Sequence, residues 1–547
     1  MNYQQARFGI HVGKILVMVL LVAGLQSAVA QETLPPYHWA QPYLNYFKVR
    51  GALPDLNYQM RPFDRMDIAR SLLNIPWYDF DFTPGEKHQL QLLFKEFQEE
   101  IALLVSEHPD QLRYKLNRAR LFLPINFPVL ESEMAITPGV YQRLGVKNFG
   151  ETTVPVFTHL RLSGRWKDNI FLYHNLSLFN EADSNYPGKE FRNFYAYSEQ
   201  AYLQYSGRWG RFKLGRDYFQ VGPGRSGQLL FSDNSLPFDM YTGQLGTGAL
   251  RFYFWGIALN PRPNLLATRS IQSRAFRYIN GHRLALHFST FSIAVNEVVL
   301  YGGPFQRWEM GLVNPFMIYY GYQVNTPSFT GNAFVSLDAT WYPLPGIEVY
   351  GEFLVDDFQV DKKEPGDLEP NELGLLIGGQ WGQPLGIPNV LVRGEYVQVR
   401  NRTYNAPVLD WEKYLHYNKV IGYYLGNNFE RYQLGGEYWF RGTMQFTGDV
   451  VVIRQGEGSV QGEFNKDYLN YTVEEGYREP FPYGVVETQW QFRGGARWSV
   501  TPWSHIAFSL QYTRFSNYQH QQGNQYSEWQ FFLTAWLQWQ KPFRFNR

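Results

Sequence analysis

Residues 489–499 read QWQFRGGARWS, and this stretch predicts the fold of most of the chain. Apolar or small residues occupy every second position from Trp490 to Trp498, and polar residues fill most of the positions between them. Successive side chains of a β-strand point to opposite faces, so such a strand has one apolar and one mostly polar face. An apolar-out, polar-in alternation over about ten residues is typical of the wall of a transmembrane β-barrel.

The same two-residue period recurs in 347–355, 432–441 and 505–513. A half-buried strand of a soluble sandwich would show it too. The number of such segments and the aromatic residues near their ends favour a membrane wall, because barrels carry aromatic girdles at both interfaces. These aromatic residues are Trp341, Trp381, Trp439, Trp498 and Trp539.

The connections between these segments alternate in length, as expected when short periplasmic turns alternate with longer extracellular loops. The long connections are 358–371, 401–429, 456–486 and 516–526, and the short ones are 343–345, 383–387, 441–443 and 500–503. Continuing this order back to residue 128 predicts a transmembrane antiparallel β-barrel of about 18 strands over residues 121–547. Its two weakest strands lie near 128–145 and somewhere within 226–246.

Composition agrees with this fold class. Aromatic residues make up 18% of the chain, yet the mean hydropathy is −0.36. After the N-terminus, no segment approaches the roughly 18 consecutive apolar residues of a transmembrane helix, which excludes an α-helical membrane protein. The net charge of +1 does not predict a nucleic-acid partner. The chain has no cysteine, so it forms no disulfides and lacks the cysteine of a bacterial lipoprotein.

The N-terminus predicts export. Arg7 and Lys14 precede the apolar run 15–25, and Ala28-Val29-Ala30 resembles a cleavage site for signal peptidase. This order is typical of a secretory signal peptide over residues 1–30. We therefore expect the mature protein in the bacterial outer membrane.

Between the signal peptide and the barrel, residues 31–120 predict a small α-helical bundle. Residues 38–50 place apolar side chains on one helix face and end at Gly51, and Asp64 can cap a second helix. Thr83 followed by Pro84 and Glu86 is a capping box that starts a third helix, whose apolar positions extend to Leu104. A bundle of about three helices is too small to bury its apolar face alone, so we expect it to act as a periplasmic plug of the barrel.

Chemical motifs are scarce. Residues 222–227 match G-x-G-x-x-G, but no strand–turn–helix unit surrounds them, so we interpret them as a glycine-rich turn in a barrel loop. The acidic stretch 356–372 has no calcium-loop spacing and is interpreted as a solvated loop rather than a metal site. No catalytic residues, no metal site and no cofactor are predicted.

Five arginines gather in 260–283 without an acid among them: Arg262, Arg269, Arg274, Arg277 and Arg283. Guanidinium groups bind carboxylate and phosphate bidentately. In an extracellular loop they would bind acidic polysaccharide or lipopolysaccharide phosphate. Equally, they could pair with lumen carboxylates such as Glu348 or Glu352.

Two segments carry a family resemblance. The first runs from Leu214 to Asp239 and the second from Gly311 to Phe316. Together with the signal peptide, small bundle and long barrel, they resemble the Wzi-like capsule assembly outer-membrane family. The motif residues are Gly215, Arg216, Asp217, Gly222, Pro223, Gly224, Ser232, Asn234, Asn314 and Pro315. The resemblance implies an 18-stranded barrel with a helical plug that holds capsular polysaccharide at the cell surface, lectin-like and without catalysis.

The helical region also resembles an S-layer-homology repeat, from Tyr43 to Leu72. Such modules precede the barrel of sugar-selective porins, so a passive channel is the alternative function. In a channel the helices would lie outside the lumen, whereas in a polysaccharide binder they would close it. Outer-membrane lipid and lipopolysaccharide are expected partners of either, and the oligomeric state is left open.

Overall fold

The computed structural model describes residues 32–123, 135–136, 139–147, 156–166, 169–182, 186–246, 248–263, 274–326, 329–359, 363–501, 504–540 and 543–544. The predicted signal peptide and the side chain of Trp539 lie outside the described residues.

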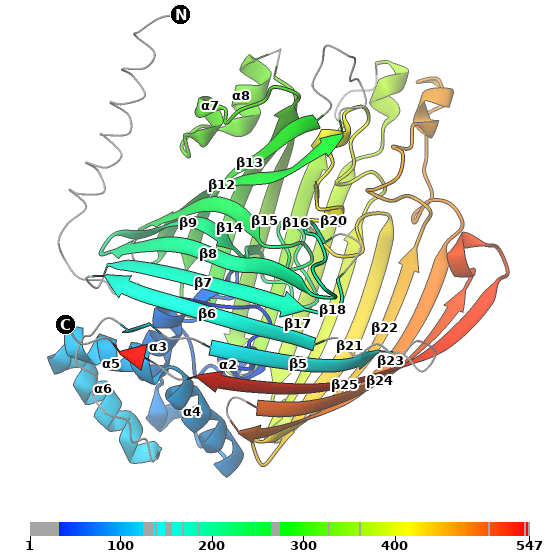
Figure 1. The fold of residues 1–547 in the computed structure, drawn as a ribbon. Helices are drawn as coiled ribbons and strands as arrows, with labels where there is room; N and C mark the ends of the chain where they lie inside the picture. Colours follow the sequence, from blue (N-terminus) through cyan, green and yellow to red (C-terminus); the bar gives the residue numbers. More distant parts are fainter. Residues whose placement is uncertain are drawn as a thin grey trace, which may run out of the picture.

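The main body is one antiparallel sheet whose strands pair in a closed ring (Figure 1). Among the described residues the ring has five strands from β5 to β9, eight from β11 to β18 and five from β21 to β25, eighteen in all. The last strand, β25, pairs with the first, β5, so every strand of the ring has two neighbours. The predicted large antiparallel sheet is confirmed.

The strands of the ring are β5 Gly139–Lys147, β6 Val156–Trp166, β7 Ile170–Phe179, β8 Tyr195–Gly207, β9 Gly210–Asp217, β11 Phe238–Leu245, β12 Leu250–Pro263, β13 Arg274–His287, β14 Phe291–Gly303, β15 Gly331–Leu344, β16 Ile347–Asp357, β17 Glu372–Gly382, β18 Val390–Val399, β21 Phe429–Phe440, β22 Met444–Gln455, β23 Glu487–Thr501, β24 Ser504–Ser516 and β25 Gln525–Gln540. Short pairs are β1 Thr33–Leu34 with β3 Phe63–Asp64, β2 Met60–Arg61 with β10 Gln220–Val221, β19 Leu415–His416 with β20 Lys419–Val420, and β4 Ala135–Ile136 with β26 Phe543–Arg544.

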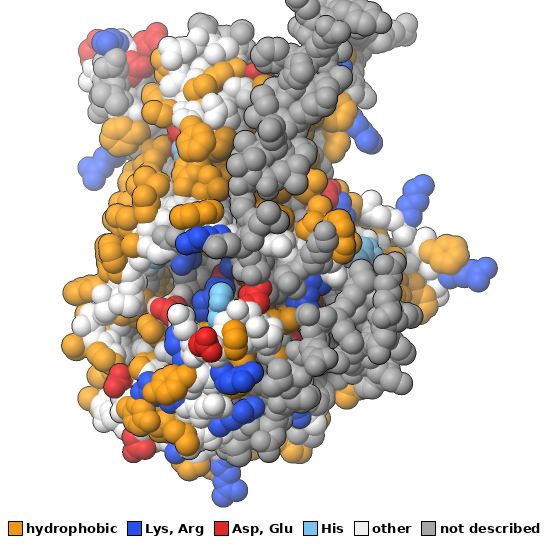
Figure 2. Space-filling model, turned by 90° about the vertical axis from the view of Figure 1, so that its left-hand side faces the viewer, with side chains coloured by type: hydrophobic (Ala, Val, Ile, Leu, Met, Phe, Trp, Pro, Cys, Tyr) orange, Lys and Arg blue, Asp and Glu red, His pale blue; other side chains and the backbone are white. Residues whose placement is uncertain are grey.

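The two faces of the wall differ as the alternation predicts. In β21, Leu434 is 65% exposed, and in β16, Phe353 is 41% exposed on the outer face. The neighbouring Tyr350 and Glu352 point into the ring and are buried. Figure 2 shows hydrophobic side chains gathered along one flank of the molecule. An apolar outer face can contact lipid because the closed ring pairs its backbone polar groups.

Connections alternate between short and long around the ring, as predicted. The chain turns within three residues between β21 and β22 but takes 31 residues, 456–486, between β22 and β23. The two weak strands are β5 and β11, inside or overlapping the predicted ranges. Both are short, with nine and eight residues, which explains their faint periodicity.

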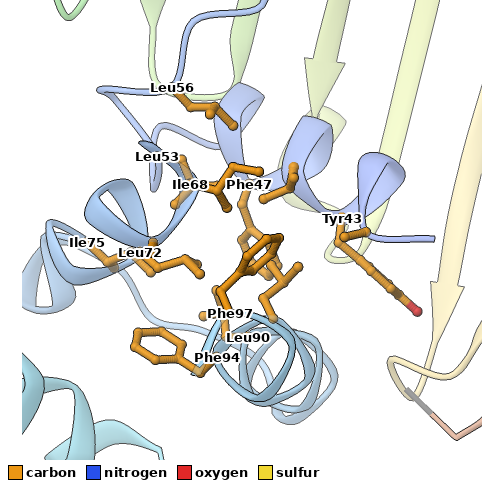
Figure 3. Close-up of a cluster of buried hydrophobic side chains, with 14 of the residues drawn as sticks. Tyr43, Phe47, Leu53, Leu56, Ile68, Leu72, Ile75, Leu90, Phe94 and Phe97 are labelled. Atoms are coloured by element: carbon orange, nitrogen blue, oxygen red, sulfur yellow. The ribbon is translucent and has the colours of Figure 1, made fainter. Parts of the chain in front are cut away.

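Five of the described α-helices precede the barrel and lie together at its short-turn end (Figure 1). They are α2 Gln41–Val49, α3 Arg65–Leu73, α4 Pro84–Glu96, α5 Gln98–Glu107 and α6 Pro109–Phe122. Asp64 caps α3, and Thr83 with Glu86 forms the predicted capping box of α4. The packed core includes Phe47, Leu72, Leu90 and Phe94, whereas Tyr43 points away from the other labelled side chains (Figure 3).

Two features of this helical domain differ from the prediction. The third helix divides at Phe97, whose φ of −99° and ψ of 21° leave the helical range. A further helix, α6, was missed because only Leu112, Leu116 and Ala119 of its fourteen residues are buried. So few apolar positions give a weak helical period.

The prediction that Trp439 belongs to an aromatic girdle is wrong. Trp341, Trp381 and Trp498 are each more than 40% exposed, but Trp439 is 1% exposed. Its ring lies 4.6 Å from the ring of Tyr43 on α2. Trp439 occupies an inward position of β21 and therefore packs on the helical domain instead of facing lipid.

Candidate functional site

The helical domain contacts the inner wall at several points around the ring. Asn45 of α2 donates to Gln380 of β17 over 2.8 Å, and Thr83 donates to Asn389 in the β17–β18 turn over 3.0 Å. Across the ring, Arg211 of β9 donates to Asp67 of α3 over 2.6 Å. These contacts place the helices in the mouth of the barrel at its short-turn end.

A second segment closes the lumen from the other end. The connection 218–237 between β9 and β11 folds inward, and its strand β10 pairs with β2 of the helical domain. The carboxylate of Glu352 accepts the backbone N–H groups of Gly224 at 2.8 Å and Leu229 at 2.7 Å. We call residues 218–237 the inward loop.

Glu395 and Glu348 hold the tip of the inward loop. Glu395 accepts the backbone N–H of Arg225 at 2.9 Å, and Glu348 accepts the Arg225 guanidinium. That guanidinium also lies 4.2 Å from the centre of the Tyr58 ring in the helical domain. The tip is therefore joined both to the wall and to the helices.

Glycine is needed where the inward loop approaches Glu352. Gly222 has a φ of +124°, and a Cβ there would lie 2.3 Å from a carboxylate oxygen of Glu352. A side chain would be strained in this conformation and would displace the carboxylate. The G-x-G-x-x-G stretch is thus a loop without a helix, as interpreted from the sequence.

The connection 400–428 covers the inward loop. Ser232 donates its backbone N–H to Ile421 over 2.9 Å, and the amide of Asn234 donates to the carbonyl of Val420 over 2.9 Å. The Tyr414 hydroxyl donates to the carbonyl of Leu230 over 2.9 Å. A hydrophobic cluster continues this contact and includes Phe231, Tyr404, Tyr414 and Val460.

The other motif residues of β9 join the wall to neighbouring elements. Gly215 has a φ of +131°, and a Cβ there would lie 2.2 Å from the carbonyl of Ala201. Arg216 pairs with Asp239 over 2.6 Å. The buried Asp217 accepts the hydroxyl of Thr33 over 2.9 Å and the Gln200 amide over 2.8 Å, so it ties the helical domain to β8 and β9.

The structure does not bring the five predicted arginines together. Arg269 lies outside the described residues, and Arg274 begins β13 as an exposed side chain. Arg262 pairs with Asp410 of the covering connection over 2.8 Å. Arg277 and Arg283, placed in or near an exposed loop by the sequence, lie inside β13 and are 1% and 0% exposed.

Burial explains this outcome. The guanidinium of Arg277 donates to three backbone carbonyls of the covering connection, including those of Trp411 and Leu415. Arg283 donates to both carboxylate oxygens of the lumen residue Asp338, with 2.9 Å for one bond. Of the two interpretations of these residues, lumen pairing fits Arg283, although the partner differs from the suggested Glu348 or Glu352.

The second motif segment lies on the outside of the ring. Asn314 and Pro315 join α7 Met310–Val313 to α8 Tyr319–Asn325, which sit beyond β12 and β13 (Figure 1). Glu297 of β14 accepts the backbone N–H groups of Tyr319 at 3.0 Å and Tyr320 at 2.8 Å. Glu297 is two positions from the exposed Val295 in β14, so its side chain also points outward. The segment with α7 and α8 therefore covers a carboxylate on the apolar outer face of the barrel.

The acidic stretch 356–372 does not form a metal centre in the part that is described. Asp356 accepts the backbone N–H of Tyr404 over 2.6 Å, and Asp367 caps the short turn after Glu364. Among the described residues, no group of three or more metal-ligating side chains could hold an ion. None of the described helices is long and apolar enough to cross a membrane.

A closed antiparallel barrel with an apolar outer face and a doubly covered lumen defines a class: an occluded barrel of the outer-membrane type. A family model described as "Capsule assembly protein Wzi" matches residues 146–528. The chain belongs to this family.

Among solved structures, one shares the fold and a second is similar over part of the chain. Wzi of Escherichia coli, described as a carbohydrate-binding β-barrel involved in group 1 capsule assembly, is 14% identical, covers 95% of this chain and 100% of its own, and has a TM-score of 0.57. OccD3 of Pseudomonas aeruginosa is 11% identical, covers 76% and 92%, and has a TM-score of 0.42. No curated protein matches the chain by sequence.

Proposed function

We propose that this protein is a transmembrane, eighteen-stranded outer-membrane barrel that binds capsular polysaccharide at the cell surface and catalyses no reaction. Family membership and the fold shared with a carbohydrate-binding barrel support the proposal. Residues 1–30 would direct export, and the helical domain would be a periplasmic plug. Outer-membrane lipid and lipopolysaccharide would surround the apolar wall.

The two segments that fold into the lumen carry this proposal. In the described residues the helical domain and the inward loop both obstruct the path of a solute through the ring, and the tip of the loop is held by Glu348, Glu352 and Glu395. Each of these hydrogen bonds contributes about 0.5–1.5 kcal/mol, so together they hold the inward loop against the wall. A passive porin would need an open path, and its helices would lie outside the lumen, whereas here they contact the inner wall.

The long connections supply a surface for sugars. In the connection 456–486, Tyr471 is 43% exposed and its ring lies 5.1 Å from the ring of Tyr477. Arg402 anchors this connection by donating to both carboxylate oxygens of Glu479, at 3.0 and 2.7 Å. Flat apolar rings with polar edges can cover a sugar face while hydroxyl groups bond nearby. We call Tyr471 and Tyr477 the tyrosine patch.

Of the predicted arginines, Arg269 and Arg274 stay in the proposal as partners for acidic groups of the polysaccharide, whereas Arg262 leaves it because its guanidinium bonds both carboxylate oxygens of Asp410. Arg277 and Arg283 leave it because their guanidinium groups are buried and bonded.

Two measurements test the proposal. Purified protein in planar bilayers should show no steady conductance, whereas large ohmic channels from intact protein would establish the porin alternative. In cells, Tyr471→Ala with Tyr477→Ala should shed more polysaccharide into the medium. Tyr114→Ala, a change of an exposed tyrosine on α6, should not. Equal retention by the patch variant and the control would refute binding at the tyrosine patch.

A further inference from the structure

A chamber of about 610 Å³ lies inside the ring between the helical domain and the inward loop and is open to solvent. Pro42 and Asn45 of α2 border it on the helical side, and Arg225 and Ser226 of the inward loop border it on the other. The rest of its lining comes from further residues of the N-terminal region and the inward loop, from inward residues of β16, β17, β18, β21 and β23, and from the covering connection. Small-molecule sites commonly have about 300–1,000 Å³, so the chamber can hold a ligand larger than a simple ion.

Positive charge exceeds negative charge in the lining. Five arginines face three acids: Arg61, Arg225, Arg393, Arg431 and Arg493 against Asp233, Glu395 and Glu437. Most of these charges have partners. Arg225 pairs with Glu348, and Arg393 with Glu437. Glu395 is occupied by backbone N–H groups and hydroxyls of the inward loop and by Tyr350.

Arg431 has unused hydrogen-bonding capacity. Its side chain is 2% exposed, Nη2 donates to Gln433 over 2.8 Å, and the guanidinium also bonds Tyr424. Its Nη1 lies 3.9 Å from Glu395, and neither Nε nor Nη1 has a hydrogen-bond partner in the described part of the chain. Buried polar groups in proteins nearly always have partners, so these donors are available to a bound ligand or to water.

Two neighbours have the same property. Within the described ranges, Nε of Arg493 and Nε of Arg61 are also buried without a hydrogen-bond acceptor. The hydroxyl of Tyr58, another lining residue, lacks a partner there too. Several guanidinium donors around one chamber match the oxygens of a carboxylate or phosphate group.

Other lining residues distinguish between such ligands. Tyr350 and Tyr424 present rings, and Gln220, Gln380 and Gln433 present amides that can both donate and accept. An inorganic anion would use only the arginines, whereas a sugar acid would also use the rings and amides through its ring face and hydroxyls. We propose that the chamber binds an acidic monosaccharide of the hexuronate class, with Arg431 and Arg493 holding its carboxylate.

This chamber lies apart from the extracellular tyrosine patch and goes beyond the proposed function. The test uses the detergent-purified full chain and isothermal titration with glucuronate, glucose and inorganic phosphate. Glucuronate should saturate below roughly 10 mM and bind at least about tenfold more tightly than glucose or phosphate. Arg431→Gln with Arg493→Gln should weaken glucuronate binding by about tenfold or more. Arg454→Gln, which changes an arginine that pairs with Glu430 outside the chamber lining, should leave it unchanged.

The site would be overturned if glucuronate did not saturate the protein, or if the double variant bound glucuronate as tightly as the parent. Phosphate binding as tight as glucuronate binding would overturn the sugar assignment. Polysaccharide retention in cells separates this inference from the proposed function. The double variant should lose glucuronate binding but retain polysaccharide normally. If it lost both, these arginines would belong to the surface-binding function, and a separate chamber site would be refuted.

Discussion

Glu352→Gln should loosen the inward loop without unfolding the barrel. The Glu352 carboxylate accepts two backbone N–H groups, from Gly224 at 2.8 Å and Leu229 at 2.7 Å. Glutamine offers one carbonyl oxygen and one NH₂ group, so it can accept only one of these bonds. The second N–H would face another donor.

The magnitude follows from these two bonds. A hydrogen bond contributes about 0.5–1.5 kcal/mol, and an unsatisfied buried group costs about 1–3 kcal/mol. The free energy of local opening should therefore fall by about 2–4 kcal/mol. Because each 1.4 kcal/mol is about tenfold in an equilibrium constant, amide exchange in 222–231 should accelerate roughly 30- to 700-fold.

Hydrogen–deuterium exchange with peptide mass spectrometry measures this change. Glu430→Gln is the control, because Glu430 is also a buried wall carboxylate but lies on the outer face of β21, where it bonds Arg454 and Tyr432 and does not contact the inward loop. Unchanged exchange in Glu352→Gln would refute the reasoning. So would equal acceleration in both variants, since that would indicate general loosening of the barrel.

Three further predictions concern stability. Leu510→Arg should cost roughly 2–4 kcal/mol because the residue faces lipid, and the lumen-facing Gln511→Arg should cost far less. Equal loss of the heat-resistant folded form in gel-shift assays would reject this register. Asp338→Asn should lower the free energy of unfolding by about 3–5 kcal/mol, because the buried Arg283 then has no ion-pair partner in Asp338. A melting temperature within about 1 °C of the parent would contradict this. In the helical domain, Arg65 and His38 lower the pKa of Glu96 from its ordinary 4.5 to about 2 despite burial. The resulting stabilisation is present above pH 4.5 and is lost as the pH falls towards 2. Acid unfolding of the helices, followed by circular dichroism, should therefore depend less steeply on pH in Glu96→Gln, and a pH profile identical to that of the parent would exclude this role.

Local patterns in the sequence predicted the elements well. The alternation around Trp490 predicted a barrel strand because the period of a strand is set by its own backbone. The capping box at Thr83 predicted the start of α4 because both partners lie within one helical turn. The alternation of short and long connections predicted the order of the strands, since it depends only on chain length between neighbours.

Only the tertiary structure decided which inward residues meet. Trp439 has the sequence environment of a girdle residue, yet its inward position places it against Tyr43, almost four hundred positions away in the chain. Arg277 and Arg283 looked like part of a charged loop, but the register of β13 turns both into the ring. A one-residue difference in where a strand begins reverses every side chain, and the sequence alone does not fix that point.

The candidate sites follow the same division. The glycines of the inward loop were visible in the sequence, but their reason was not, because Glu352 and Glu395 come from strands more than a hundred residues later. The chamber lined by Arg431 and Arg493 had no local signal at all, since these arginines look like ordinary lumen-facing residues of two separate strands. Closing the ring brings them to one cavity, where some of their donors have no hydrogen-bond acceptor in the described part of the chain.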